Sequence, residues 1–391
     1  MRPDILSGME LCQGFKVPDM TTMDFAGVAH YIDTALPKEA PPMFGLHPNA
    51  EIGYLTSTAE KLFETILVLE GASSGGGGGD SGGSSVRDTL EDLLARLPEN
   101  FVMIDIEMKA EPLLKEATSP YVLVAMQECG RMNVLLNKIR FSLIELRKGM
   151  DGQLNMTQAM EDLKSALSIM QVPGRNLFHT TTWEKSAWPS KKGLASWFQD
   201  LLRRVEQLER WTTDMVLPTA LWIPGLFNPM AFLTAIMQIT ARQESEPLDK
   251  MVLETHVTTM TKPEQATSYP PQSGAYVYGM FIEGARWPVG EEAGEASEVA
   301  GVQVSGFLCD GRLKELLPPL PVMYVRAVVV QPQWEPTEVG YMRHSETIFD
   351  CPVYYTTMRG PTYIFLATLT TQDPVAKWVL SGVAITLQED T

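Results

Sequence analysis

One uncharged run constrains the fold of this chain more than any other stretch of its sequence. No charged residue occurs from Met215 to Met237, a length that could cross a bilayer. However, Pro218, Pro224 and Pro229 interrupt this run. A lipid-exposed span must complete its backbone hydrogen bonds within itself, and these prolines prevent that. The run is therefore predicted to be a buried corner between packed elements.

A helix is predicted on each side of this corner, which we call the elbow (217–227). After the elbow, Asn228 is a helix-capping residue and Pro229 occupies the first turn. Both helices show an apolar stripe at helical spacing. The stripes comprise Leu194, Trp197, Phe198, Leu201, Leu202, Val205, Leu208 and Trp211 before the elbow, and Phe232, Leu233, Ile236, Met237 and Ile239 after it. On the opposite face of the first helix we expect Arg203, Arg204, Glu206 and Arg210.

Large aromatic side chains near the elbow are predicted to anchor it. Trp222 lies in the middle of the uncharged run and is expected to be a core residue. Phe227 immediately precedes the helix cap, so it is either a core residue or a partly exposed staple against the following helix. The polar connection 175–193 is expected to be a surface loop with Trp183 and Trp188 as its anchors.

The chain before residue 175 is predicted to be mostly helical. We divide it into an irregular, half-extended segment ending in one helix (1–70), a flexible linker rich in glycine and serine (71–85) and an antiparallel helical bundle (86–174). The glycine run of the linker lacks the Lys-Ser/Thr pair that a phosphate-binding P-loop needs. Capping residues and helix-breaking residues predict helices at 57–71, 85–98, 119–148 and 157–173.

Beyond Asp249 the apolar period changes from that of a helix to that of a strand. Gly, Pro and Asp-rich turns separate the strand candidates. They lie at 251–257, 276–282, 299–309, 322–330, 349–356, 362–369 and 378–387. The sequence therefore predicts an α+β fold in which a helical bundle and a helix pair precede an antiparallel six- or seven-stranded barrel. The acidic stretch 290–298 is expected to be a solvated hairpin excursion.

Composition limits the possible partners of this chain. Its 391 residues have a formal net charge of −17, which argues against binding to nucleic acid or to an anionic membrane. Cys12, Cys129, Cys309 and Cys351 form no CxxC pair, so a zinc knuckle or a dense disulfide framework is not indicated. A reducing compartment and protein partners fit these properties best.

The sequence offers no clear catalytic constellation. The histidines at positions 30, 47, 179, 256 and 344 have no metal-binding spacing, and no GxSxG elbow marks a nucleophile. Cys351 is expected to be a packed thiol, and Gly279 and Gly284 to belong to a strand, bulge and turn. Arg286-Trp287 is either an interface anchor or, as we prefer, a structural pair at the rim of the barrel. We predict no catalytic, cofactor-binding or metal-binding residue.

Several collinear segments closely resemble the C-terminal region of dynein heavy chains, and of axonemal dyneins in particular. They are MFGLHPNAEIGYLT (43–56), LASWFQDLLRRVEQLERW (194–211), LWIPGLFNPMAFLTAIMQ (221–238), GAYVYGMFIEGARW (274–287), FDCPVYYTTMRG (349–360) and KWVLSGVAITLQ (377–388). The resemblance implies that 86–174 are the helical bundle of the sixth AAA+ module, which retains no working nucleotide site. It implies that 175–248 and 249–391 are the helical and barrel parts of the C-terminal domain.

The resemblance also implies a role. In that family the C-terminal domain packs on the AAA+ ring and tunes ATP-driven, microtubule-based motility of cilia and flagella. The expected partners are the other AAA+ modules of the same heavy chain and, through the whole motor, intermediate chains, light chains and microtubules. ATP and Mg would bind other modules, and no cofactor is expected here. The expected location is the cytoplasm, the cytoskeleton and the axoneme of a cilium or flagellum, and the chain is expected to be a part of a longer one.

Without the resemblance, the strands would suggest a different protein class. A free-standing barrel with a helical cap could bind a small ligand or a partner peptide. Such a protein should be monodisperse alone and have a well-formed, polar-lined pocket. A ring component should instead expose a broad apolar flank.

Overall fold

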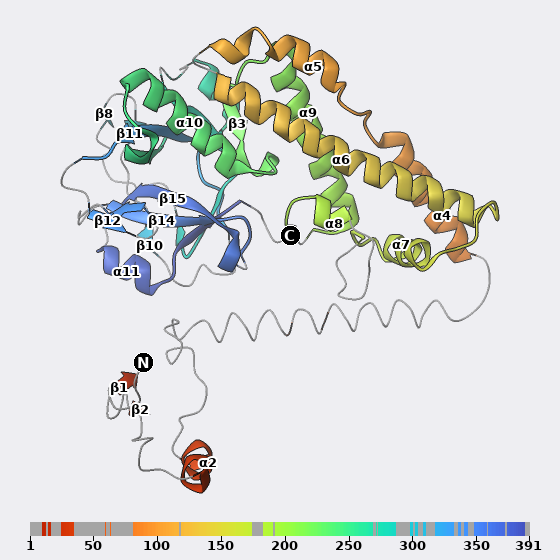
Figure 1. The fold of residues 1–391 in the computed structure, drawn as a ribbon, viewed down its shortest axis with the longest axis horizontal. Helices are drawn as coiled ribbons and strands as arrows, with labels where there is room; N and C mark the ends of the chain where they lie inside the picture. The colour runs from red at the N-terminus through yellow and green to blue at the C-terminus, as the bar shows by residue number, and fades with distance from the viewer. Residues whose placement is uncertain are drawn as a thin grey trace. The chain divides into compact units, whose positions relative to one another are not determined.

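The structure is a computed structural model that divides into two units, Met1–Asp80 and Ser81–Thr391, which we describe separately (Figure 1). The residues that it describes are 10–12, 15–16, 25–34, 59, 63, 81–116, 119–173, 183–190, 192–268, 271, 273–286, 298–299, 302–303, 308–309, 317–331, 335–337, 340–342, 348–357, 359–371 and 374–387.

The described residues of the first unit include one short hairpin and the helix α2. Strands β1 (Glu10–Cys12) and β2 (Phe15–Lys16) pair antiparallel, and helix α2 spans Phe25–Thr34. The prediction of irregular structure throughout 1–56 is therefore wrong over 25–34, where FAGVAHYIDT lacks proline and has only one glycine. Of the helix predicted at 57–71, only Ala59 and Phe63 are described, and both are helical.

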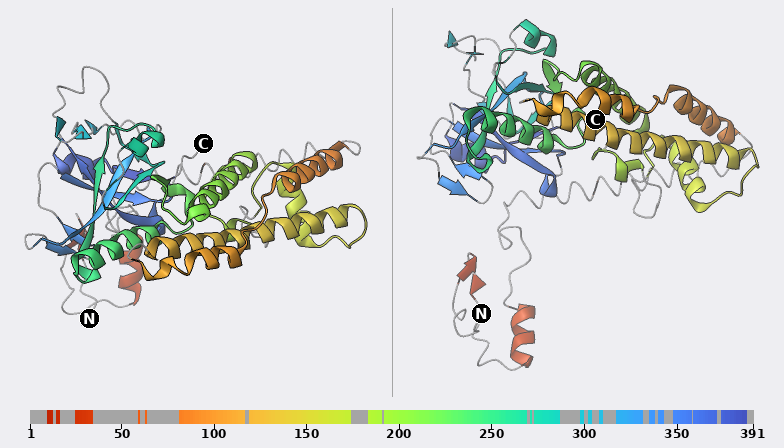
Figure 2. Two further views of the ribbon diagram at one scale, coloured as in Figure 1. Left: turned by 90° about the horizontal axis from the view of Figure 1, so that it is seen from above. Right: turned by 45° about the horizontal axis from the view of Figure 1, so that its top comes forward.

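The second unit begins with the helical bundle. Its helices are α4 (Ser81–Arg96), α5 (Met103–Ala110), η2 (Leu113–Lys115), α6 (Ser119–Met150), α7 (Gln158–Ser168) and α8 (Trp183–Ser186). Helix α6 is central, because α4, α5, α7, α8 and the later helices α9 and α10 all contact it (Figure 2). Its predicted apolar face is fully buried and comprises Leu135, Leu136, Ile139, Leu143 and Leu146. This packing explains the stability of so long a helix.

The bundle agrees with the sequence in its long helices and differs at their ends. Thr157 caps α7 as predicted, since its Oγ1 accepts a hydrogen bond from the Met160 N–H at 3.4 Å. Helix α4 begins at Ser81, so 81–85 are helical and do not belong to the linker. Val86 and Leu90 are buried in the same helix, and this docking favours helix despite a weak local propensity. Helix α5 is not predicted by the sequence pattern.

Two further helices flank the elbow. They are α9 (Leu194–Asp214) and α10 (Pro229–Glu244), and the elbow between them contains strand β3 (Ala220–Trp222) and a 3-10 turn, η3 (Ile223–Gly225). Asn228 caps α10 by accepting a hydrogen bond from the Ala231 N–H at 3.3 Å. The elbow is buried from Leu221 to Leu226, which confirms the predicted corner. No helix within the described residues has the length and apolarity that a membrane span requires.

Eight of the strands described in the second unit form two four-stranded sheets. The first has the order β3-β5-β11-β4, and the second β15-β14-β16-β6. Neighbours are antiparallel except for the parallel pairs β3–β5 and β14–β16. The strands are β4 (Met251–Val257), β5 (Ala275–Tyr278), β6 (Phe281–Glu283), β11 (Met323–Val329), β14 (Ile348–Tyr354), β15 (Tyr363–Thr370) and β16 (Ala384–Thr386).

The remaining strands form two-stranded pairs: β7 (Ala285–Arg286) with β10 (Leu308–Cys309), β8 (Glu298–Val299) with β9 (Val302–Gln303), and β12 (Glu335–Thr337) with β13 (Gly340–Met342). Short helical turns lie at η4 (Leu248–Lys250), η5 (Pro263–Ser268) and η7 (Gly360–Thr362), and helix α11 spans Val375–Leu380.

The α+β class is confirmed, whereas a closed barrel is not found among the described strands. The two large sheets approach each other at their edge strands, β4 and β15. There the Thr255 hydroxyl donates to the Thr368 carbonyl oxygen at 3.0 Å and accepts from the Thr368 N–H at 2.7 Å. One side chain therefore makes the contact that a ladder of backbone bonds would make in a closed barrel. Helix α10 contacts β4, β11 and β15, so it packs against both sheets.

Three predicted strands differ from the observed ones. The strand predicted at 299–309 is wrong, because its described residues belong to three strands, β8, β9 and β10, and β8 pairs antiparallel with β9. The strand predicted at 378–387 is wrong over its first half, because Trp378 lies in α11 and packs against Phe349 with ring centroids 5.2 Å apart. The strand predicted at 276–282 is divided at Gly279, which has a φ of 89°. A Cβ there would lie 2.4 Å from Cδ1 of Trp222, so the elbow excludes any larger residue.

Candidate functional site

The elbow is held by polar side chains from three different elements, which we call the elbow clamp. It comprises Glu128 of α6, Arg204 and Gln207 of α9, and Tyr355, which follows β14. Each of them hydrogen-bonds to the backbone between residues 222 and 228. The clamp therefore joins the bundle, the helix pair and the second sheet at one place.

Gln207 pairs with the elbow as a neighbouring strand would. Its Oε1 accepts from the Trp222 N–H at 2.8 Å, and its Nε2 donates to the Trp222 carbonyl oxygen at 3.1 Å. The space beside this pair is closed, since a Cβ on Gly225 would lie 2.6 Å from the Gln207 Nε2. The amide thus satisfies both backbone groups of a buried residue and fixes the position of β3 against α9.

Glu128 binds the start of α10. Its side chain is buried, and its two carboxylate oxygens accept from the Phe227 N–H at 2.6 Å and the Asn228 N–H at 2.9 Å. A helix begins with unpaired N–H groups and a partial positive charge, which favour an anion there. Burial raises the pKa of Glu128, while the two backbone hydrogen bonds act in the opposite direction.

Arg204 supplies a buried cation near this carboxylate. Its guanidinium stacks 3.7 Å above the Trp188 ring, and its Nη1 lies 3.5 Å from the Leu226 carbonyl oxygen. Burial lowers the pKa of Arg204 to about 10, so the side chain is still charged at neutral pH. Its Nε has no hydrogen-bond partner within the described part of the chain. The sequence pattern assigns Arg204 to the solvent face of α9, and this prediction is wrong, because the side chain is fully buried.

Tyr355 connects the second sheet to the same backbone. Its hydroxyl lies 2.8 Å from the Leu226 carbonyl oxygen and 3.0 Å from that of Phe227, and it donates to them. Burial raises the pKa of this hydroxyl, so it stays a donor at neutral pH. The elbow is thus bonded to α6 through two N–H groups and to the strand layer through two carbonyl groups. The elbow backbone therefore connects the two layers directly.

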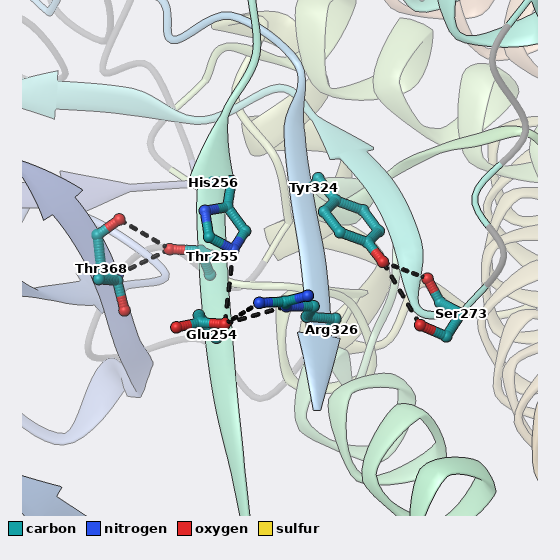
Figure 3. Close-up of polar contacts among 7 residues, drawn as sticks. All are labelled: Glu254, Thr255, His256, Ser273, Tyr324, Arg326 and Thr368. Atoms are coloured by element: carbon teal, nitrogen blue, oxygen red, sulfur yellow. Dashed lines mark hydrogen bonds and ion pairs between the residues drawn. The ribbon is translucent and has the colours of Figure 1, made fainter. Parts of the chain in front are cut away.

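A second polar cluster lies on β4 and β11 of the first sheet (Figure 3). Glu254 accepts from Arg326 through Nη2 at 2.6 Å and Nε at 2.9 Å, and His256 Nε2 lies 3.5 Å from the same carboxylate oxygen. The Tyr324 hydroxyl donates to the Ser273 carbonyl oxygen at 2.6 Å. The His256 hydrogen bond and the Arg326 ion pair lower the pKa of Glu254 to about 2, against the opposing effect of burial.

This cluster provides cross-strand pairing. Glu254 and Arg326 are directly opposite each other in the register of the two strands, as are His256 and Tyr324. Opposite charges and aromatic rings in such positions stabilise a sheet. His256 is half-buried beside one carboxylate, and no cluster of metal-binding residues occurs among the residues that the structure describes.

The other residues singled out in the sequence are placed as follows. Cys129 and Cys351 are buried free thiols whose pKa burial raises, which confirms the packed environment predicted for Cys351. The tryptophan anchors of 175–193 are confirmed, since Trp183 and Trp188 are buried against Trp197. The side chains of His47, His179, His344, Cys12, Cys309, Arg286 and Trp287 lie outside the described residues, as does nearly all of the acidic stretch 290–298.

The sequence contains a signal for the clamp that the prediction does not use. Glu128 lies between Ala125 and Met132 at helical spacing, on the buried side of α6. Arg204 is three residues after Leu201 and four before Leu208, within the apolar stripe of α9. A charged residue inside an apolar stripe indicates a buried, compensated charge. The absence of catalytic, cofactor-binding and metal-binding residues stays a prediction.

Comparisons with known proteins give the family. The family of C-terminal domains of dynein heavy chains matches residues 56–387. The chain is 43% identical over 391 residues to dynein axonemal heavy chain 17 of Homo sapiens and to the ciliary dynein beta chain of Tripneustes gratilla. It is 41% identical over 387 residues to the flagellar outer arm dynein alpha chain of Chlamydomonas reinhardtii. These matches cover 98–99% of this chain but only 8% of each relative. The chain belongs to the dynein heavy chain family, in the region of the C-terminal domain.

Proposed function

We propose that this chain is the C-terminal part of an axonemal dynein heavy chain and acts there as a structural and regulatory element without hydrolysing ATP. The match over nearly the whole chain to axonemal, ciliary and flagellar heavy chains supports this proposal. In it, 86–174 are the helical bundle of the sixth AAA+ module, and 175–248 and 249–391 are the helical and strand parts of the C-terminal domain. The predicted barrel belongs to the same proposal, with β4 and β15 meeting at Thr255.

The observation that carries the regulatory role is the elbow clamp. Glu128 belongs to the bundle, and it binds Phe227 and Asn228, the two residues that precede α10. Two more contacts join the same helices: Arg242 of α10 donates to the Ser119 hydroxyl of α6 at 2.8 Å, and Tyr121 stacks on Phe232. Since α10 packs on both large sheets, a movement of α6 would be passed to the strand layer as a movement of one body.

The bundle would therefore report the state of the ring to the strand layer, and the strand layer would restrain the ring in return. ATP and Mg would bind in other AAA+ modules of the same heavy chain. The intermediate chains, light chains and microtubules would be partners of the whole motor. This role would be performed in the cytoplasm, in the axoneme of a cilium or flagellum. No contact among the described residues favours the alternative of a free-standing barrel protein.

An axonemal dynein heavy chain that carries this region offers the test. Glu128→Ala should slow microtubule gliding by at least about twofold at saturating ATP, because the bundle and the strand layer would no longer move together. Glu145→Ala changes an exposed carboxylate of the same helix and should leave gliding unchanged. Circular dichroism at the assay temperature confirms that both motors are folded. Equal gliding velocities of the two variants would show that the clamp has no regulatory role.

A further inference from the structure

A small, partly enclosed cavity of about 130 Å³ lies between α9, the elbow and the turn that joins β5 to β6. Trp222 of the elbow and Gly279 of this turn form part of its wall. A water molecule takes about 30 Å³ of the liquid, so the cavity has room for about four waters or for one small polyatomic ion. Pockets for drug-sized molecules have volumes of about 300–1,000 Å³. The size of this cavity therefore suits an ion and not a nucleoside.

The charge of the cavity wall selects an anion. Three cationic side chains line the cavity, those of Lys192, Arg203 and Arg204. Asp200 is the only carboxylate among the described lining residues, and it binds Lys192 at 3.2 Å. Neither arginine forms an ion pair with any residue that the structure describes. In a chain whose net charge is −17, this is a local excess of positive charge.

Arg204 has donor capacity that the protein does not use. The side chain is fully buried, yet its Nε has no hydrogen-bond partner among the described residues, and its Nη1 reaches only the Leu226 carbonyl oxygen at 3.5 Å. Buried polar groups are nearly always paired. The Trp188 ring covers one face of the guanidinium at 3.7 Å, so a further partner has to approach the edge that carries the N–H groups.

Arg203 brings a second guanidinium to the same place from the solvent side. Its Cζ lies 4.0 Å from the centre of the Trp222 ring, and the Cζ of Arg204 lies 5.3 Å from the same ring. The positive charge of Arg203 acts to lower the pKa of Arg204, as expected for two like charges close together. An anion between the two guanidinium groups would remove this repulsion and accept charge-assisted hydrogen bonds from both.

We propose that this cavity binds a phosphate group, as the free ion or as a small monoester. Guanidinium groups match the oxygens of a phosphate in pairs, and a phosphate carries nearly two negative charges, which suits the two arginines that have no ion-pair partner. The bound group contacts α9 through Arg203 and Arg204 and lies against Trp222 of the elbow. This inference goes beyond the proposed function, because the site needs no other part of a motor.

The test uses the full chain and inorganic phosphate, whose binding is followed by phosphorus NMR in about 0.1 M chloride, where distant charges are screened. One saturable site with a dissociation constant of about 0.1–1 mM is expected, with no need for Mg. Arg203→Gln should weaken binding by about tenfold or more, because one charged partner is lost. Arg203 is exposed, so this variant keeps its core.

The matched control is Arg96→Gln in α4. Arg96 is also an exposed arginine, and its guanidinium lies over an aromatic ring, that of Phe198, at 5.4 Å. This variant loses the same charge and the same kind of ring contact outside the cavity, so phosphate binding should be unchanged.

A change of opposite sign separates this site from general attraction to cations. Asp200→Asn should tighten binding by about threefold or more, because it removes a negative charge from the cavity wall, whereas Asp214→Asn, at an exposed site on the same helix, should not. None of these residues belongs to the elbow clamp, so the result is separate from that of the gliding assay.

Competition identifies the source of the phosphate group. Displacement of inorganic phosphate by glycerol phosphate assigns the site to a monoester, and lack of displacement assigns it to the free ion. The proposal is overturned if inorganic phosphate and glycerol phosphate both fail to bind saturably, or if Arg203→Gln binds like the unchanged protein. It is also overturned if Asp200→Asn does not tighten binding.

Discussion

Replacing Glu128 by alanine should remove one of the largest single contributions to the stability of this fold. The carboxylate accepts two hydrogen bonds, at 2.6 Å and 2.9 Å, from backbone N–H groups at the start of α10. Each donor left without a partner costs about 1–3 kcal/mol. We expect a loss of about 2–6 kcal/mol, because two buried N–H donors lose their acceptor.

Glu128→Gln provides a graded version of the same change. Glutamine retains one oxygen acceptor, and its NH₂ group cannot accept from the second N–H. The expected loss is therefore about 1–3 kcal/mol. The free energy of unfolding of both variants is measured by urea denaturation at neutral pH, with tryptophan fluorescence as the signal. Glu145→Ala, on the exposed face of α6, is the matched control. The reasoning is wrong if Glu128→Ala and Glu145→Ala unfold at the same urea concentration.

Three further predictions concern the elbow, the first sheet and nucleotide binding. Trp222→Ala should lower the free energy of unfolding by about 3–5 kcal/mol, because Trp222 is buried under Arg203. Phe227→Ala should lower it by less, since Phe227 is half-buried. Unchanged melting temperatures in both variants would refute the assignment of these residues to the core. Because the pKa of Glu254 is lowered to about 2, this carboxylate stabilises the fold above about pH 4.5, and the stabilisation is lost as the pH falls toward about 2. Glu254→Gln should therefore reduce the change in unfolding free energy between these pH values by roughly 1–2 kcal/mol, after allowance for solvent screening. The same dependence of unfolding on pH in the variant and the unchanged protein would contradict this prediction. The purified protein should not bind ATP, and saturable Mg-dependent micromolar binding of a labelled nucleotide would refute this.

The sequence pattern predicts an element correctly where the residues that set the pattern are also the residues that pack in the core. Helix α6 is predictable because Leu135, Ile139 and Leu143 repeat with the helical period and are all buried. The elbow is predictable because prolines exclude a membrane span from its uncharged run. In both cases the signal and the structure depend on neighbouring residues of the sequence.

The elements that local patterns do not predict depend on contacts with distant residues. Trp378 belongs to a strand-like run, yet it lies in α11 because its ring packs on Phe349. Arg204 is predicted to face solvent because it is charged, yet its guanidinium is buried against the Trp188 ring. The partners of Glu128 are about one hundred residues away, at Phe227 and Asn228. A single sequence contains no record of such pairings, so the partners of the clamp residues emerge only from the structure.

In the proposed role, the bundle and the strand layer move as one body because the elbow clamp joins them. A distance measurement by pulsed electron paramagnetic resonance in an intact heavy chain tests this, with spin labels at exposed sites replacing Glu107 in α5 and Val379 in α11. Noncanonical amino acids carry the labels, so the native cysteines stay untouched. The predicted result is one narrow distance distribution that is the same with and without nucleotide and broadens in Glu128→Ala. A distance in the unchanged motor that shifts with nucleotide would contradict the claim, because the elbow would then be a hinge.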